Sequence, residues 1–293
     1  MRELSKIFGV GDVTAVELMR AGAKSVEDLM DEKGNPLEMY STVKITNSMK
    51  LGVQFFEATN TKMPRAEVED IAQAVRGCIS TLLPGGAGAY ELIPAGSYRR
   101  GAGMCGDCDC FLSRLDGGSV YELICDLLDF LDPTPPPPGD PTGGVSKGVA
   151  GSHGTGIRLV RLIAPSAKSA ADEEGDAFHV PTFCGLISLG PEGPWRRVDI
   201  KGYPKKFKAY ALLHMTGDDL FNRSLRLFAS KKATAMSLSD KGLRPVLRDR
   251  NRAKQYIGDH LLDAETEEEV FAFLGVPYST PAMRSVKTLL VRP

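Results

Sequence analysis

The segment GSYRRGAGMCGDCD, at positions 96–109, constrains the fold of this 293-residue chain more than any other feature. It places Asp107 and Asp109 one residue apart, just beyond a glycine-rich turn that carries a serine and two arginines. If the residues after Gly106 are extended, side chains at i and i+2 leave the same face of the strand, so both carboxylates point to one spot. Such a pair favours Mg²⁺, and the backbone N–H groups of a Gly- and Ser-rich turn can approach phosphate oxygens. A short DxD motif also occurs as an incidental surface pair, so this interpretation depends on the rest of the chain.

A third carboxylate is expected from Asp199 in the segment RRVDIK, which alternates like a strand and carries Arg196, Arg197 and Lys201 beside the acid. In two-metal nucleotidyl transfer, one ion lowers the pKa of the attacking 3′-hydroxyl and the other holds the triphosphate, so carboxylates that bridge both ions are the minimum requirement. Three acids and a phosphate-binding turn therefore indicate nucleotidyl transfer.

The composition is that of an ordinary soluble globular protein, with 42% hydrophobic and 25% charged residues in a chain long enough for two or three lobes. No apolar stretch approaches membrane-spanning length and the N-terminus lacks a signal-peptide pattern, so we expect an intracellular protein without a membrane partner. The six cysteines do not suggest a secreted disulfide framework. Three of them form a CxxCxC motif at 105–110, but no second Cys or His pair follows at ligand spacing, which argues against zinc.

The charge is unevenly distributed along the chain. The net charge of −1 argues weakly against nucleic-acid binding, yet positions 196–254 hold 16 Lys and Arg against five Asp, a local excess of +11. Such a segment can follow a phosphate backbone, with binding that weakens steeply in salt, although a solvated basic face is the plainer interpretation of a charge cluster.

Periodicity and turn residues predict a mixed α+β protein. Helices are expected at 13–21, near Ser25, at 65–83 and at 120–130. Gly22 is expected to end the first helix, and Ser25 and Asp28 fit the capping pattern of a helix start. Strands are expected at 90–94, 107–112, 157–163, 178–189 and 197–200, which gives a mixed sheet with helices on one side. The proline-rich stretch 132–144 is expected to be a loop or insertion, and 166–176 is a second irregular, acidic stretch.

Six segments in order resemble the family X DNA polymerases of the nucleotidyltransferase superfamily, most closely the lambda and beta type. IFGVGDVTAVELMRAGAKSVEDL (7–29) is similar to the family's helix-hairpin-helix, MPRAEVEDI (63–71) to the entry to its palm, and GSYRRGAGMCGDCD to its nucleotide and metal motif. TGDDLFNRSLR (216–226), MSLSDKGL (236–243) and VFAFLGVPYSTPAMRS (270–285) are similar to its thumb. The resemblance implies a polymerase beta-like hand with helical fingers at 1–65, a nucleotidyltransferase palm at 66–211 with an insertion at about 132–156, and an α/β thumb at 212–293.

The resemblance also implies roles for individual residues. Asp107 and Asp109 would ligate two Mg²⁺ ions, for which Mn²⁺ is expected to substitute, and Asp199 would ligate the catalytic one. Ser97 and Arg100 would hold the β- and γ-phosphates. The rest of the implied nucleotide site is Lys62, Gly96, Cys105, Gly106, His214, Met215, Gly217, Asp219 and Asn222. The implied DNA contacts are Gly9, Val10, Gly11, Arg197, Lys201, Arg223 and Arg226, and the carbonyls of Ser5, Ile7 and Val10 would hold Na⁺ or K⁺ at the hairpin.

Two departures from the family pattern bear on activity. His214 and Met215 stand where the family typically has Tyr-Phe, so we expect weaker discrimination against ribonucleotides. The chain begins almost at the hairpin, as a natural short form or a fragment would, so we expect no 5′-deoxyribose phosphate lyase activity from it.

The expected function is template-directed filling of short gaps in DNA repair, with gapped or primed duplex DNA and dNTP as substrates and rNTP as an alternative nucleotide. We expect a monomer in the nucleus, with the mitochondrion or another DNA-containing compartment still open. A template-independent terminal transferase, suggested by the stretch 166–176, and a DNA-end-binding scaffold with weak catalysis are the alternatives.

Overall fold

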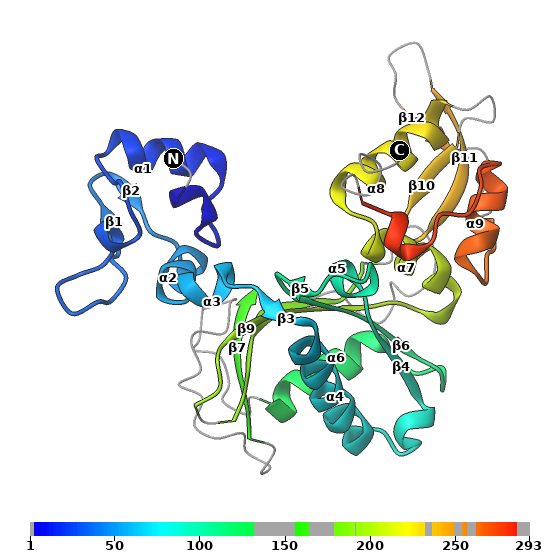
Figure 1. The fold of residues 1–293 in the computed structure, drawn as a ribbon, viewed down its shortest axis with the longest axis horizontal. Helices are drawn as coiled ribbons and strands as arrows, with labels where there is room; N and C mark the ends of the chain where they lie inside the picture. Colours follow the sequence, from blue (N-terminus) through cyan, green and yellow to red (C-terminus); the bar gives the residue numbers. More distant parts are fainter. Residues whose placement is uncertain are drawn as a thin grey trace.

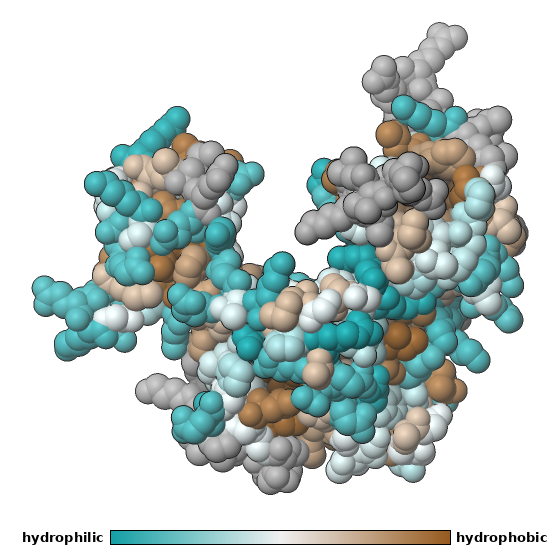
Figure 2. All heavy atoms as spheres, viewed as in Figure 1, coloured by the Kyte–Doolittle hydropathy of each residue, from teal (hydrophilic) through white to brown (hydrophobic). Residues whose placement is uncertain are grey.

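The computed structural model describes residues 3–131, 156–163, 179–190, 192–231, 236–248, 254–256 and 262–285. They form three lobes, each around its own buried cluster, with the N-terminal and C-terminal lobes rising from opposite ends of a central sheet (Figure 1). The space-filling view shows the surface hollowed between these two lobes (Figure 2). The proline-rich stretch 132–144, the acidic stretch 166–176 and nearly all of the expected insertion lie outside the described residues. Within the described residues, no helix combines the length and apolar character that crossing a membrane requires.

The N-terminal lobe is built from short helices. A 3₁₀ turn at Leu4–Lys6 leads into the FGVG hairpin and α1, and Gly22, at φ +106°, ends that helical segment as expected. The helix expected near Ser25 is only a 3₁₀ turn, Glu27–Leu29. The Asp28 carboxylate accepts the N–H groups of Lys24 and Ser25, as the expected capping pattern requires, but the next residue, Met30, is extended and pairs with Pro36. The elements of this lobe are α1 (Asp12–Arg20), the hairpin β1 (Met39–Tyr40) and β2 (Val43–Lys44), α2 (Asn47–Gln54) and α3 (Phe56–Asn60).

The central lobe is a five-stranded mixed sheet in the order β4-β6-β9-β8-β7, in which β6 and β9 run parallel and the other neighbouring strands antiparallel. A two-stranded ribbon of β3 and β5 lies beside it. The expected mixed sheet is confirmed. Its elements are β3 (Met63–Pro64), α4 (Arg65–Leu82), β4 (Tyr90–Pro94), α5 (Gly96–Arg99), β5 (Met104–Cys105), β6 (Cys108–Arg114), α6 (Val120–Leu131), β7 (Ile157–Ile163), β8 (Thr182–Leu189) and β9 (Arg196–Gly202).

The two faces of this sheet have different side chains, because successive residues of a strand alternate between them. Cys108, Cys110 and Leu112 of β6 pack with Val198 and Ile200 of β9 in the cluster that α4 and α6 cover. Burying each aliphatic side chain of that cluster contributes about 1.5–3 kcal/mol. The intervening residues of the same strands face the other way, toward the side of the sheet that α5 and α7 (Lys208–Thr216) partly cover. That second face carries the acidic residues.

The C-terminal lobe packs helices against a three-stranded sheet, β10-β11-β12. A second cluster, which includes Phe111 of β6, Phe207 and Met215, joins α7 to the central sheet. The elements are a 3₁₀ turn (Lys205–Phe207), α7 (Lys208–Thr216), α8 (Asp219–Lys231), β10 (Met236–Ser239), β11 (Gly242–Arg248), β12 (Lys254–Tyr256), α9 (Glu267–Leu274) and a 3₁₀ turn (Pro281–Met283).

Candidate active site

Three carboxylates meet at the centre of the sheet. Asp109 of β6 lies directly opposite Asp199 of β9 in the parallel register, and Asp107 lies in the bend just before β6. One oxygen from each acid lies within 4.8 Å of the others, and in the described part of the chain this is the one such group of Asp, Glu, His or Cys. The strand expected from position 107 begins instead at Cys108, because β5 pairs with β3 and the chain must turn at 106–107 to enter the main sheet.

The electrostatics of this cluster favour a cation. Burial raises the pKa of Asp109 to about 7, helped by repulsion from Asp107 and Asp199, and burial also raises the pKa of Asp107. One oxygen of Asp199, Oδ1, is buried and accepts no hydrogen bond from any described residue. Partly buried carboxylates that repel one another and leave an oxygen unpartnered are the donor set that a divalent ion would satisfy, so these residues fit the expected metal site.

Arg197 supplies positive charge to the cluster. Its Nη2 lies 3.0 Å from Asp107 Oδ2 and 3.1 Å from Asp199 Oδ2, and the side chain is about one-quarter exposed at 28%. The resemblance implies a DNA contact for Arg197, whereas here it bridges two acids. Its neighbour Arg196 faces the other side of the sheet and pairs with Glu67 of α4 at 2.8 and 3.1 Å.

The glycine-rich turn, residues 96–106, approaches Asp109 closely. Gly96 has φ +52°, and a Cβ atom there would lie 2.1 Å from Asp109 Oδ2, so a glycine is required for both conformation and space. The turn is fixed to α4 by Tyr98, whose hydroxyl donates to Glu69 Oε2 at 2.7 Å and whose ring lies 3.7 Å beneath the Arg65 guanidinium. Ser97 lies in the short helix α5 of the same turn.

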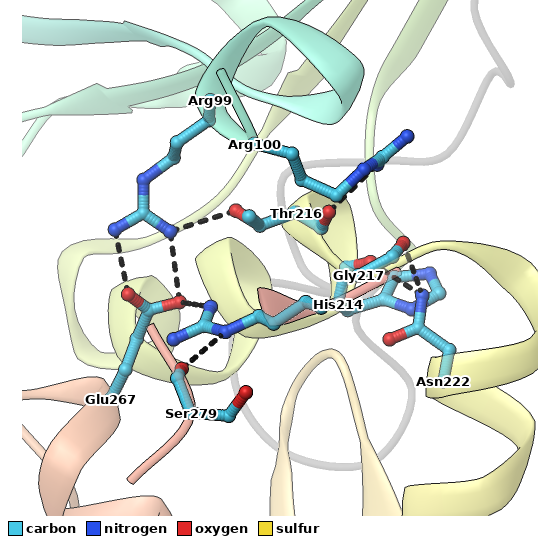
Figure 3. Close-up of polar contacts among 9 residues, drawn as sticks. Arg99, Arg100, His214, Thr216, Gly217, Asn222, Glu267 and Ser279 are labelled. Carbon is cyan, nitrogen blue, oxygen red and sulfur yellow. Dashed lines mark hydrogen bonds and ion pairs between the residues drawn. The ribbon is translucent and has the colours of Figure 1, made fainter. Parts of the chain in front are cut away.

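The turn between α7 and α8 lies against this glycine-rich turn (Figure 3). Arg100 Nη1 donates to the Thr216 carbonyl at 2.8 Å, and Asn222 Nδ2 donates to the carbonyls of His214 and Gly217 at 2.8 and 3.0 Å. Gly217 leaves room for Asn222, because a Cβ there would lie 2.6 Å from Asn222 Oδ1. Burial and the nearby Arg226 guanidinium lower the pKa of His214, whose Nδ1 lies 3.2 Å from Arg226 Nη2.

The remaining predicted residues of the palm and thumb lie at several places around the site. Lys201 follows Asp199 on the acidic face of β9, Cys105 is buried in the central core and Gly106 is exposed beside Asp107. The other cysteines of the CxxCxC motif, Cys108 and Cys110, are also buried in that core and belong to no metal-binding group among the described residues. Lys62 is exposed just before β3, Met215 is a buried residue of α7, and Asp219 forms an exposed ion pair with Arg223.

The FGVG hairpin lies on the N-terminal lobe, apart from the acids (Figure 1). Gly9 has φ +84°, the Ile7 carbonyl accepts the Val10 N–H at 3.0 Å, and Gly11 is the residue before α1. Ser5 lies in the preceding 3₁₀ turn. The hairpin is held by α2, where Gly52 lets the Phe8 carbonyl approach the helix closely.

Four residues that sequence reasoning did not single out connect the glycine-rich turn to the C-terminal lobe. Arg99 donates to Thr216 Oγ1 at 2.7 Å and to both oxygens of Glu267 at 2.9 and 2.6 Å, and Glu267 also pairs with the fully buried Arg284. Arg99 and Glu267 are 168 positions apart, so no spacing rule connects them. Glu267 is the first of three consecutive glutamates at the start of α9, so the sequence gives no sign that this one is buried and paired.

Known protein families match the two larger lobes. Residues 62–132 match the DNA polymerase beta palm, and residues 211–285 match the DNA polymerase beta thumb. Over 281 residues the chain is 30% identical to DNA polymerase lambda of Arabidopsis thaliana, covering 96% of this chain and 45% of the relative. It is 29% identical to DNA polymerase lambda of Rattus norvegicus, covering 96% of this chain and 41% of the relative. It is 26% identical to human DNA-directed DNA/RNA polymerase mu, covering 97% of this chain and 52% of the relative.

The chain thus spans about half the length of these relatives. The matched palm contains Asp107 and Asp109 with the turn that precedes them, and the matched thumb contains the turn at Thr216. The mixed sheet, the three acids and these matches lead to one assignment: the chain belongs to the family X DNA polymerases and contains the palm and thumb of their catalytic core.

Proposed function

We propose that this protein fills short gaps in DNA by template-directed nucleotidyl transfer from dNTP to a primer 3′-hydroxyl. The observation that carries the proposal is the cluster of Asp107, Asp109 and Asp199, with ligand oxygens within 4.8 Å of one another beside a glycine-rich turn. Polymerase lambda of Arabidopsis thaliana and rat are relatives across 96% of the chain, which supports templated synthesis over untemplated tailing.

In the proposed reaction Asp107 and Asp109 would hold two Mg²⁺ ions, and Asp199 would hold the catalytic one together with them. When bound, the ions would supply a lowered pKa for the primer hydroxyl and positive charge beside the phosphates, and Mn²⁺ is expected to substitute. Ser97, Arg100 and the Gly106 N–H hold the β- and γ-phosphates, with Gly96 and Cys105 shaping the turn and Lys62 adding positive charge. Holding the triphosphate in line with the primer end is the main contribution of these side chains.

The thumb residues bind the nucleoside and the DNA. Asn222 hydrogen-bonds the minor-groove edge of the incoming base, while Gly217 and Asp219 line the base and sugar beside His214 and Met215. Arg223 lies near the templating base, Arg226 contacts the template strand, and Lys201 is a further DNA contact. At the hairpin, Gly9, Val10 and Gly11 grip a DNA phosphate, with Na⁺ or K⁺ on the carbonyls of Ser5, Ile7 and Val10. Such contacts do not depend on the DNA sequence.

The protein is proposed to act as a monomer in the nucleus.

The testing experiment is primer extension on a one-nucleotide-gapped duplex and on a bare single-stranded primer, with Mg²⁺ and then Mn²⁺. Complementary addition in the gap, absent from Asp107→Ala, is the expected result. Untemplated tailing of the bare primer would replace the proposal by a terminal transferase. If both the unchanged protein and Asp107→Ala bind DNA but neither extends the primer, the proposed polymerase function would be replaced by that of a DNA-end-binding scaffold.

We further propose weak discrimination between dNTP and rNTP. The supporting observation is His214, which stands in place of an aromatic wall and whose side chain is turned to Arg226 at 3.2 Å. The relative named DNA-directed DNA/RNA polymerase mu has a name consistent with such use of both sugars. His214→Tyr is expected to increase dNTP preference about tenfold or more, since a crowded pocket rejects an extra group by that order. Matched incorporation assays that already show strong dNTP preference in the unchanged protein would contradict this.

A further inference from the structure

A buried ion cluster joins the two turns that form the proposed nucleotide site. Arg99 of α5 forms two hydrogen bonds to the Glu267 carboxylate, at 2.9 and 2.6 Å (Figure 3). One of these carboxylate oxygens, Oε1, also accepts a hydrogen bond from Arg284. Glu267 is 6% exposed and Arg284 is 0% exposed, so both charges are removed from water. Charges buried this deeply are stable only when paired, which makes the relative positions of the three side chains tightly determined.

The cluster is connected to the thumb turn at both its ends. Arg99 Nη1 donates to Thr216 Oγ1 at 2.7 Å, and the Arg284 carbonyl accepts the Asp218 N–H at 3.0 Å. Arg284 is itself fixed, because its Nε donates to the Ser279 carbonyl at 2.8 Å and its guanidinium lies 5.5 Å from the rings of Phe271 and Tyr278.

The glycine-rich turn is connected to the same place. Arg100, next to Arg99, donates to the Thr216 carbonyl at 2.8 Å, while Tyr98 holds the turn to α4 through Glu69. Thr216 therefore receives two arginines from one turn, one on its hydroxyl and one on its carbonyl. Glu267 and Arg284 thus connect the glycine-rich turn, through Arg99, to the thumb turn, through Asp218.

We propose that Arg99, Glu267 and Arg284 are positioning residues that hold the thumb turn at 216–219 against the glycine-rich turn and so set the affinity for the nucleoside triphosphate. This inference rests on the proposed nucleotidyl transfer, in which the two turns bind the phosphates and the nucleoside. The cluster itself touches neither the acids nor the hairpin by any contact within the described residues.

The test measures binding without turnover. A fluorescent dNTP is titrated into protein bound to a gapped duplex with a dideoxy-terminated primer, in Mg²⁺, for the unchanged protein, Glu267→Gln, Arg99→Gln and the double variant. The nucleotide Kd is expected to rise at least fivefold in each single variant. It is expected to rise no further in the double variant, because all three variants break the same Arg99–Glu267 pair. Arg99→Lys is expected to keep part of the affinity that Arg99→Gln loses, because lysine keeps the positive charge but cannot donate two parallel hydrogen bonds to Glu267.

The matched control is Arg114→Gln, which breaks the two-pronged Arg114–Asp116 pair at 2.8 and 2.6 Å on β6, away from both turns. This variant is expected to have a nucleotide Kd within twofold of that of the unchanged protein. Every variant is expected to have a DNA Kd within twofold of that of the unchanged protein. An unchanged nucleotide Kd in folded Glu267→Gln, or equal losses of nucleotide and DNA affinity, would overturn the inference. So would failure of the unchanged protein to bind nucleotide. Nucleotide binding without primer extension would refute the proposed function alone.

Discussion

Gly96 shows how a single hydrogen in place of a side chain determines where Asp109 can lie. Its φ is +52°, and a Cβ atom would lie 2.1 Å from Asp109 Oδ2, so no other residue type fits without strain. Gly96→Ala is expected to destabilise the protein by about 1–3 kcal/mol, as overpacking does, and to abolish primer extension by displacing the carboxylate. Gly103→Ala is the control, because a Cβ there meets nothing within 4 Å. Thermal unfolding and gap-filling rates measure both effects. Primer extension by Gly96→Ala would contradict the prediction, because it would show that Asp109 can still bind the metal when residue 96 carries a Cβ.

The positive charge of Arg197 pairs with carboxylates that a divalent ion would also bind. Its Nη2 is 3.0 Å from Asp107 and 3.1 Å from Asp199, so a cation must compete with it for the carboxylates. Arg197→Gln is expected to bind Mn²⁺ several-fold more tightly, since removing about 1.4 kcal/mol of competing interaction is a tenfold change. Mn²⁺ titration followed by electron paramagnetic resonance measures this, with Arg196→Gln as control because Arg196 pairs with Glu67 instead. Unchanged or weaker Mn²⁺ binding would contradict it.

At the scale of elements, the hairpin and α2 form one unit through Gly52. A Cβ at Gly52 would lie 2.1 Å from the Phe8 carbonyl, so α2 can lie this close to the hairpin only with glycine there. Gly52→Ala is expected to cost about 1–3 kcal/mol of stability and to weaken DNA binding, because it moves the residues that we propose to grip a phosphate.

A second helix offers a matched control. Gly77 of α4 has open space where a Cβ would lie, so Gly77→Ala is expected to be neutral or to stabilise by up to about 1 kcal/mol, through helix propensity. Denaturation midpoints and DNA affinities of the two variants separate a steric effect from the loss of a glycine as such. Equal behaviour of both variants would exclude the steric explanation.

For the whole molecule, the Arg99–Glu267–Arg284 cluster makes stability depend on pH. Burial raises the pKa of Glu267, but the hydrogen bonds and charges of Arg99 and Arg284 outweigh burial and lower it overall. A lowered carboxyl pKa contributes stability that is present above the unfolded value of about 4.3 and is lost as pH falls through the folded value. Glu267→Gln is expected to cost about 3–5 kcal/mol at pH 7, the usual cost of breaking a buried pair, and progressively less below about pH 4.

Urea unfolding of the unchanged protein and Glu267→Gln at pH 7 and in steps down to about pH 2.5, well below the unfolded pKa, measures this difference. Glu265→Gln, at an exposed position just before the same helix, serves as the control and is expected to change stability little across this range. A stability difference that stays constant with pH would mean that the charge of Glu267 is not what holds the lobes.

Much of the fold follows from local pattern. The strand at 90–94, the strand at 157–163 and the long helix from Arg65 agree with the structure to within a residue, because alternation and helical periodicity are properties of neighbouring residues. The segment near Ser25 differs, because the chain becomes extended at Met30 and pairs with Pro36 after a single turn, although Asp28 caps the Ser25 N–H as expected. Pairing with a residue farther along the chain is not visible in periodicity.

Residue type and spacing were sufficient to predict that two carboxylates follow a glycine-rich turn and that a third stands in a strand with arginines. They could not predict that Asp109 and Asp199 lie in register, that Arg197 turns to the acids, or that Glu267 meets Arg99, all of which depend on tertiary packing. The physical reason is distance along the chain: strand register and the pairing of buried charges depend on how separate lobes pack, and residues 90 to 168 positions apart have no local pattern that could encode their contact.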